Sequence, residues 1–102
     1  MVTKRTLAEI KNILEKHKTE LKAKYGIKEI GIFGSYLRGE QKEKSDLDVL
    51  VEFEPDAKID LIKFVELEEH LSDLLGINVD LVMKSALKPR IGERILREVV
   101  YI

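Results

Sequence analysis

The sequence predicts an α/β fold in which helices pack on a small mixed β-sheet. Three short apolar runs with strand-like composition alternate with segments whose apolar residues recur at helical spacing. Gly26 and Gly76 stand just past the first two helical segments, where helices commonly end. A length of 102 residues suits one domain with a two-layer or three-layer core, so we expect residues 1–102 to form a single domain.

The N-terminal helix is predicted to begin after Thr6, because Thr6 and Glu9 have the spacing of a capping box. Its apolar side consists of residues at helical spacing, namely Leu7, Ile10, Leu14, His17 and Leu21. We interpret it as a packing helix. His17 is expected to pack and not to bind a metal, because no second ligand stands at a metal-binding spacing. The first strand, residues 27–33, follows Gly26.

The second strand is predicted over residues 47–53, with alternate residues on opposite faces. Its apolar face carries Leu47, Val49, Val51 and Phe53, and its polar face carries Asp46, Asp48, Glu52 and Glu54. Asp60 can cap the next helix, whose apolar stripe is Phe64, Leu67, Leu71 and Leu74. The third strand is expected over residues 76–82.

The C-terminal segment is predicted to form one helix, because Pro89 suits a first helical turn. Its apolar residues are Ile91, Ile95, Val99 and Ile102. Between the first two strands, the segment 39–45 is rich in Glu and Lys and is predicted to be a mobile loop.

Gly34-Ser35 is predicted to form a turn between the first strand and a short helical stretch, residues 36–38. Backbone N–H groups at the start of a helix have no partner inside the helix and can bind anions such as phosphate. Taken alone, a Gly-Ser pair is more often only a turn. A functional interpretation of this turn therefore depends on the acidic residues further along the chain.

Ten residues separate Ser35 from Asp46, and Asp46 and Asp48 stand at the start of the second strand. Residues two apart on a strand face the same side, about 6.5 to 7 Å apart, so the two carboxylates point in one direction. The alternative is a half-exposed strand with solvated acids. Against it, Asp is a poor strand former, and two neighbouring carboxylates repel each other unless a cation neutralises them.

Asp80 is a single acid within the apolar third strand. If this strand lies beside the second, about 4.8 Å away, Asp80 completes a cluster of three carboxylates that suits one or two divalent ions. Taken alone, Asp80 would be a residue of a strand edge. The clustering of three acids favours a ligand.

Composition narrows the class of protein. The formal net charge is −1, from 18 Lys and Arg against 19 Asp and Glu. The chain therefore lacks the excess of positive charge that is typical of proteins that bind nucleic acid directly. The sequence contains no cysteine, no membrane-spanning run and no apolar core of a signal peptide at its start. We therefore expect a cytoplasmic protein.

Three segments together resemble a known family: residues 31–40, 45–51 and 79–82. They are similar to the DNA polymerase beta superfamily of nucleotidyltransferases, and within it to the minimal nucleotidyltransferases (MNT), which are antitoxins beside HEPN-domain toxins. The resemblance covers nearly the whole chain and implies the polymerase beta-like nucleotidyltransferase fold. Leu37 departs from the family, which more often has a small residue there, and this should alter helix packing and not chemistry.

The resemblance implies a role for each candidate residue. The Gly34-Ser35 turn would hold the terminal phosphates of ATP, and Asp46 and Asp48 would bind Mg²⁺ bridging them. Asp80 would help bind a second Mg²⁺ and assist deprotonation of the acceptor hydroxyl. Arg38 would either steady phosphate charge or pair with Glu40 or a strand acid. The catalytic and metal-binding set is therefore Asp46, Asp48 and Asp80, and the nucleotide-binding set is Gly34, Ser35 and Arg38.

Three functions remain compatible with the sequence. The first is transfer of AMP from ATP to a hydroxyl of a HEPN toxin, which neutralises the toxin. The second is the same chemistry on a small molecule or an RNA end. It needs a surface that binds the acceptor, and so short a chain supplies that surface only if it forms a homo-oligomer. The third is a non-catalytic module that neutralises a toxin by contact alone. The presence of all three acids argues against the third.

Overall fold

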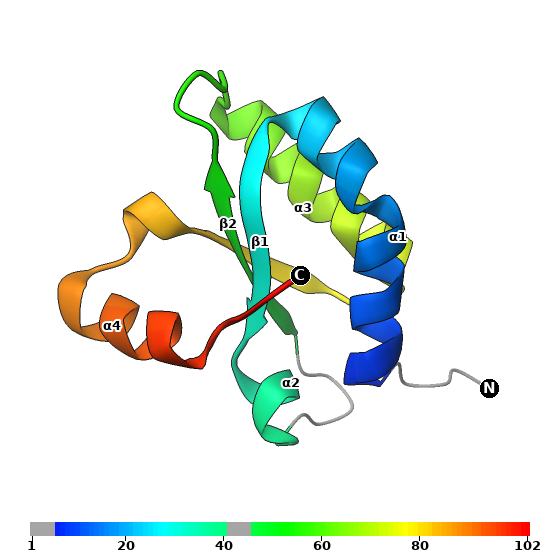
Figure 1. Ribbon diagram of the computed structural model, residues 1–102, viewed down its shortest axis with the longest axis vertical. Helices are drawn as coiled ribbons and strands as arrows, with labels where there is room; N and C mark the ends of the chain where they lie inside the picture. Colours follow the sequence, from blue (N-terminus) through cyan, green and yellow to red (C-terminus); the bar gives the residue numbers. More distant parts are fainter. Residues whose placement is uncertain (1–5, 41–45) are drawn as a thin grey trace.

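The computed structural model describes residues 6–40 and 46–102, so part of the predicted loop 39–45 lies outside the described residues. Its elements succeed one another as shown in Figure 1. They are α1 (Leu7–Tyr25), β1 (Ile27–Phe33), α2 (Ser35–Arg38), β2 (Leu47–Phe53), α3 (Leu61–Leu75), β3 (Val79–Met83), the 3₁₀ turn η1 (Lys84–Ala86), α4 (Pro89–Glu98) and β4 (Val100–Tyr101).

The four strands form one mixed sheet in the order β3-β2-β1-β4. β1 is antiparallel to both of its neighbours, β2 and β4, whereas β2 and β3 are parallel and are connected through α3. In Figure 1, α1 and α3 lie together on one side of the sheet, and α4 lies on the other side. This mixed sheet with packed helices confirms the predicted fold class.

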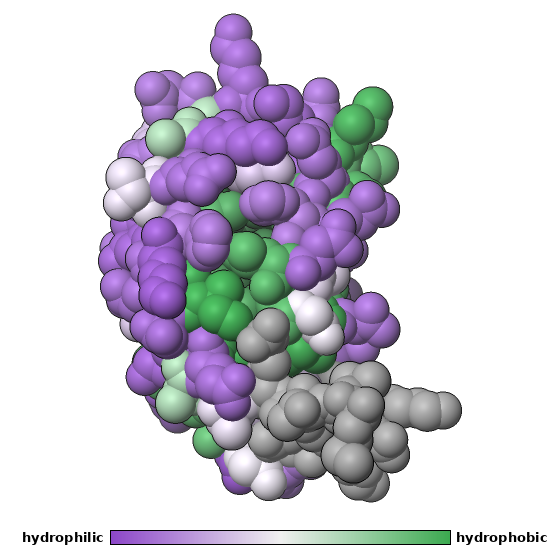
Figure 2. Space-filling view, turned by 90° about the vertical axis from the view of Figure 1, so that its right-hand side faces the viewer, coloured by the Kyte–Doolittle hydropathy of each residue, from purple (hydrophilic) through white to green (hydrophobic). Residues whose placement is uncertain are grey.

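The α1 and α3 side of the sheet holds the hydrophobic core. Alternate residues of β2, Leu47, Val49 and Val51, are fully buried in one cluster with the inner faces of α1 and α3. The intervening residues Asp48 and Leu50 must therefore lie on the opposite face of β2. Figure 2 views the molecule from the side of α1 and α3, whose outer surface is largely hydrophilic with an apolar area near its centre.

The first helix agrees with the prediction at both ends. The Thr6 hydroxyl accepts a hydrogen bond from the Glu9 backbone N–H at 3.2 Å, and the Glu9 side chain accepts from the Thr6 N–H, which completes the capping box. Gly26 ends the helix in the left-handed conformation, with a φ of 67°.

The second helix begins at the predicted cap, but its buried stripe ends differently. Asp60 Oδ1 accepts from the Lys63 N–H at 2.8 Å. Leu67, Leu71 and Leu75 are fully buried, whereas Leu74, which the sequence pattern placed on the apolar stripe, is only partly buried. A helix advances by 3.6 residues per turn, so Leu75 continues the spacing of four residues that Leu67 and Leu71 begin.

The C-terminal segment corrects the sequence prediction. The last helix ends at Glu98 and not at Ile102, and the chain then forms the short edge strand β4 beside β1. Gly31 makes this approach possible, because a Cβ there would lie 2.6 Å from Val99 Cγ2 and 3.0 Å from the Val100 carbonyl oxygen. The Ile102 N–H then donates to the Ile30 carbonyl at 2.9 Å, and Ile102 is buried in the core.

β3 starts at Val79, later than the predicted 76–82, because Gly76 serves as the C-cap of α3. Two side chains of α3 fix its position, since Ser72 Oγ accepts from the Val79 N–H and Glu68 Oε2 accepts from the Leu81 N–H, both at 2.9 Å. None of the helices in the described ranges is both long enough and apolar enough to cross a membrane.

Candidate active site

The candidate site residues meet where β1 ends and where β2 and β3 begin. Phe33, the last residue of β1, is paired with Asp48, and Asp48 is paired with Asp80 of the parallel strand β3. Directly paired residues of neighbouring strands point to the same face, so both carboxylates lie on the face away from α1 and α3. The expected adjacency of the second and third strands is confirmed.

Gly34 forms the floor of the site beneath Asp48. Its backbone has a φ of 85° and a ψ of −154°, a region that only glycine adopts without strain. A Cβ at this position would lie 2.0 Å from Asp48 Oδ2, far inside van der Waals contact. The absence of a side chain at Gly34 therefore lets the Asp48 carboxylate lie directly against the β1–α2 turn.

The surroundings of Asp48 disfavour its charged form. It is half-buried, and burial together with the negative charges of Asp80 and Asp46 raises the pKa of Asp48 to about 6. Asp46 precedes β2 and, like Asp80, is exposed. The negative charges of Asp46 and Asp80 therefore both act on Asp48.

The donor set suits a hard divalent cation. Across residues 6–40 and 46–102, no three acidic, histidine or cysteine side chains already converge closely enough to hold a metal ion. Asp46 and Asp80 are exposed, however, so their side chains can change rotamer without disturbing the core. Carboxylate oxygens are the ligands that Mg²⁺ prefers, and a cation beside Asp48 would relieve the repulsion among the acids. The residues fit Mg²⁺, and their role as its ligands stays a prediction.

Ser35 and Arg38 belong to α2, the short helix that comes after Gly34. Ser35 is partly exposed at its first position. Of the two interpretations of Arg38, the pairing with Glu40 is observed, since Arg38 Nε donates to Glu40 Oε1 at 2.5 Å. A contact with phosphate remains a prediction.

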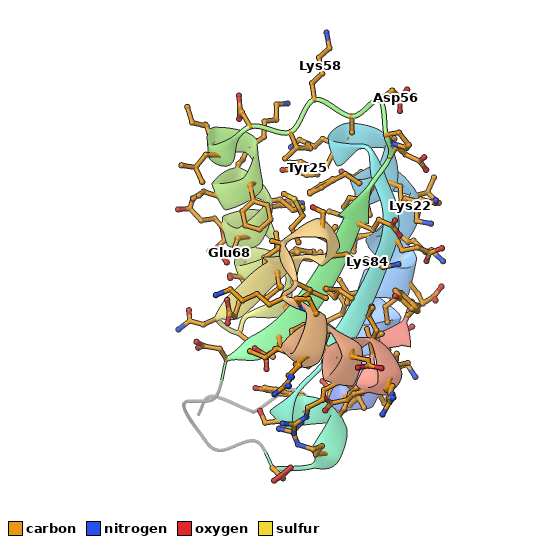
Figure 3. The ribbon with its side chains drawn as sticks, turned by 90° about the vertical axis from the view of Figure 1, so that its left-hand side faces the viewer. Lys22, Tyr25, Asp56, Lys58, Glu68 and Lys84 are labelled. Carbon is orange, nitrogen blue, oxygen red and sulfur yellow. The ribbon has the colours of Figure 1, made fainter. Side chains whose placement is uncertain are left out.

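Glu98 is the site residue that the sequence did not reveal. It is the last residue of α4, and its Oε1 accepts hydrogen bonds from the Gly34 N–H at 3.2 Å and from Arg38 Nη1 at 2.6 Å. Its charge also contributes to raising the pKa of Asp48. The views in Figures 1 and 3 agree that α4 lies on the site face of the sheet, next to α2. No motif linked Glu98 to residues more than fifty positions earlier.

The raised pKa of Asp48 predicts a pH-dependent change in stability. Ionised Asp48 is destabilised in the fold, so its cost is fully present above pH 6 and disappears as the pH falls toward 4. A rise from 3.8 to about 6 corresponds to at most about 3 kcal/mol, which solvent screening reduces to about 1 to 2 kcal/mol. Without divalent cations, Asp48→Asn should therefore be more stable than wild type by that amount at pH 8 and equally stable at pH 4. Thermal unfolding in EDTA measures this difference, and a difference independent of pH would contradict it.

Comparison with known protein families agrees with this site. Residues 14–102 match the nucleotidyltransferase domain family, and the chain belongs to that family. The enzyme class expected from the sequence is thereby confirmed. The chain is 59% identical over 97 residues to the protein adenylyltransferase MntA of Thermococcus cleftensis, and the aligned region covers 95% of this chain and 96% of that protein. In structure it is similar to a protein described as a minimal nucleotidyltransferase, with a TM-score of 0.71, 36% identity and coverage of 89% and 93% of the two chains.

Two solved toxin–antitoxin complexes also contain a similar chain. One holds AMP-PNP and matches with a TM-score of 0.68 and 26% identity, over 85% of this chain and 70% of that chain. The other is a tri-AMPylated HEPN toxin bound to an MNT antitoxin from Shewanella oneidensis, with a TM-score of 0.64 and 21% identity, over 90% and 70%. At 21% identity the second likeness concerns the fold alone.

Proposed function

We propose that this chain is a Mg²⁺-dependent nucleotidyltransferase that transfers AMP from ATP to a hydroxyl group of a partner protein in the cytoplasm. We further propose that the partner is a HEPN-domain toxin, which the transfer neutralises. The observation that carries the proposal is the position of Asp48, which lies against the Gly34 turn and is paired with Asp80. This arrangement supports the proposal because it places a backbone turn that could bind phosphate next to two carboxylates that could bind a cation.

The comparisons support the choice of acceptor. A relative that is 59% identical over almost the whole chain is named a protein adenylyltransferase. A chain of similar fold at 26% identity belongs to a toxin–antitoxin complex that contains an ATP analogue. These relatives favour a protein acceptor over a small molecule or an RNA end.

The residues of the chain divide the reaction between them. The Gly34-Ser35 turn and Arg38 would hold the β- and γ-phosphates, while Asp46 and Asp48 would hold Mg²⁺. When bound, Mg²⁺ supplies positive charge that offsets the charge of the triphosphate. Asp80 would accept the proton of the acceptor hydroxyl, whose oxygen then bonds to the α-phosphorus while the bond to pyrophosphate breaks. The products are an AMP-modified protein and pyrophosphate.

Substitution of Asp80 tests this proposal. Asp80→Asn should still bind Mg²⁺-ATP but should lower the rate of AMP transfer by about a hundredfold, because the acid nearest the acceptor is lost. Purified chain is incubated with Mg²⁺, each nucleoside triphosphate and a HEPN-domain protein from the same organism, and the mass of both proteins is measured. Wild type should add the mass of AMP to the toxin.

Co-expression separates catalysis from neutralisation by contact. Wild type should restore growth of cells that express the toxin, whereas Asp80→Asn should not. Full rescue by Asp80→Asn with an unmodified toxin would refute the enzymatic proposal. AMP found on RNA or on a small molecule, with none on the toxin, would refute the protein acceptor.

A further inference from the structure

Glu98 already binds the groups that the proposed function assigns to phosphate. A single oxygen, Oε1, accepts from both the Gly34 N–H and the Arg38 guanidinium. The Glu98 side chain is only 26% exposed, compared with 67% for Glu93 on the same helix. The Glu98 side chain is therefore partly buried against Gly34 and Arg38, whereas Glu93 forms an exposed surface ion pair with Arg97.

The chemistry of these contacts is that of anion binding. A guanidinium and a backbone N–H that converge on one anionic oxygen would bind a phosphate oxygen in the same way. The Gly34 backbone has one N–H, so the Glu98 carboxylate and a phosphate oxygen compete for it. The charge of Glu98 also competes with phosphate for the Arg38 guanidinium. The charge of Glu98 also adds to the negative potential around Asp48, which opposes the approach of a polyanion.

We propose that Glu98 occupies the triphosphate subsite of the free protein and that ATP must displace it in order to bind. This inference rests on the proposed function, because it names the residue that sets the affinity of that same site. When a site is closed for part of the time, the apparent affinity falls by the fraction of molecules in which it is open. Glu98 thus lowers the affinity for ATP. A ligand binds well only if its phosphates replace the contacts of Glu98 with Gly34 and Arg38.

The test compares Glu98→Gln with Glu93→Gln. Glutamine keeps the length of the side chain and an acceptor oxygen for the Gly34 N–H, but it removes the charge that binds Arg38. We expect Glu98→Gln to bind Mg²⁺-ATP about three to ten times more tightly than wild type, a change typical of losing a partly exposed charged contact. Glu93→Gln, which removes the same charge from the same helix, should bind as wild type does. Calorimetric titration measures all three affinities.

Inorganic tripolyphosphate shows which part of the nucleotide is affected. It should gain affinity for Glu98→Gln by the same factor as ATP, because the two hydrogen bonds of Glu98, with Gly34 and Arg38, are to groups assigned to phosphate. Equal or weaker binding of Mg²⁺-ATP by folded Glu98→Gln would overturn the inference and would make Glu98 a structural or metal-binding residue. Glu98→Asp, which withdraws the carboxylate but keeps the charge, is a second variant and should show a smaller gain.

The two proposals fail in different ways. If wild type binds and transfers nucleotide but Glu98→Gln binds no more tightly, only the inference on Glu98 fails. If neither folded protein binds Mg²⁺-ATP, the proposed function and the inference are both overturned.

Discussion

Asp48→Asn is expected to lower the rate of AMP transfer by about a thousandfold or more. Asp48 is half-buried near the charges of Asp80 and Asp46, and loss of its own charge would leave the proposed Mg²⁺ site with too little negative charge to hold the ion. The same substitution should remove the Mg²⁺-dependent part of ATP binding. Single-turnover transfer to the proposed toxin acceptor measures the rate, and calorimetry with and without Mg²⁺ measures the affinity.

Asp56→Asn is the matched control for this variant. It makes the same chemical change at an exposed turn, and Figure 3 shows Asp56 at the end of the molecule opposite α2. Its transfer rate and its affinity for Mg²⁺-ATP should equal those of wild type. Unchanged affinity in Asp48→Asn would remove Asp48 from the metal site, and equal losses in both variants would indicate a general effect of charge.

Local signals predicted most of the fold. The capping box at Thr6, the cap at Asp60 and the alternation in β2 each depend on residues close together in the sequence, and each is present in the structure. β4 was missed because two residues carry almost no periodic signal. Its formation depends on Gly31, which permits close approach of a segment about seventy residues later.

The site was predictable only where a motif marks it. Asp46, Asp48 and Asp80 were found by their spacing, and the common face of Asp48 and Asp80 is a consequence of the register between β2 and β3. The contact between Gly34 and Asp48 was not foreseen, because it depends on how β1 and β2 pair. Glu98 was missed for the same reason, since a glutamate at the end of a charged helix resembles any solvated residue.

Gly34→Ala is expected to reduce AMP transfer about as severely as Asp48→Asn, by about a thousandfold. The added Cβ would lie 2.0 Å from Asp48 Oδ2, so the carboxylate must leave the position that it holds against the β1–α2 turn. Alanine is strained in the backbone conformation that Gly34 adopts, and this strain should lower the free energy of unfolding by about 1 to 3 kcal/mol. Transfer assays and chemical denaturation measure the two effects.

Gly39→Ala separates the collision from the glycine conformation. Gly39 also has a positive φ, 69°, but a Cβ there would meet no atom within 4 Å among the described residues. It should therefore lose some stability and keep its transfer activity. The double variant Gly34→Ala/Asp48→Ala removes the atom that the new Cβ strikes. Its loss of stability should therefore be smaller, by about 1 kcal/mol or more, than the sum of the losses in the single variants Gly34→Ala and Asp48→Ala. Strict additivity, or normal transfer by Gly34→Ala, would show that Asp48 does not depend on the space that Gly34 leaves.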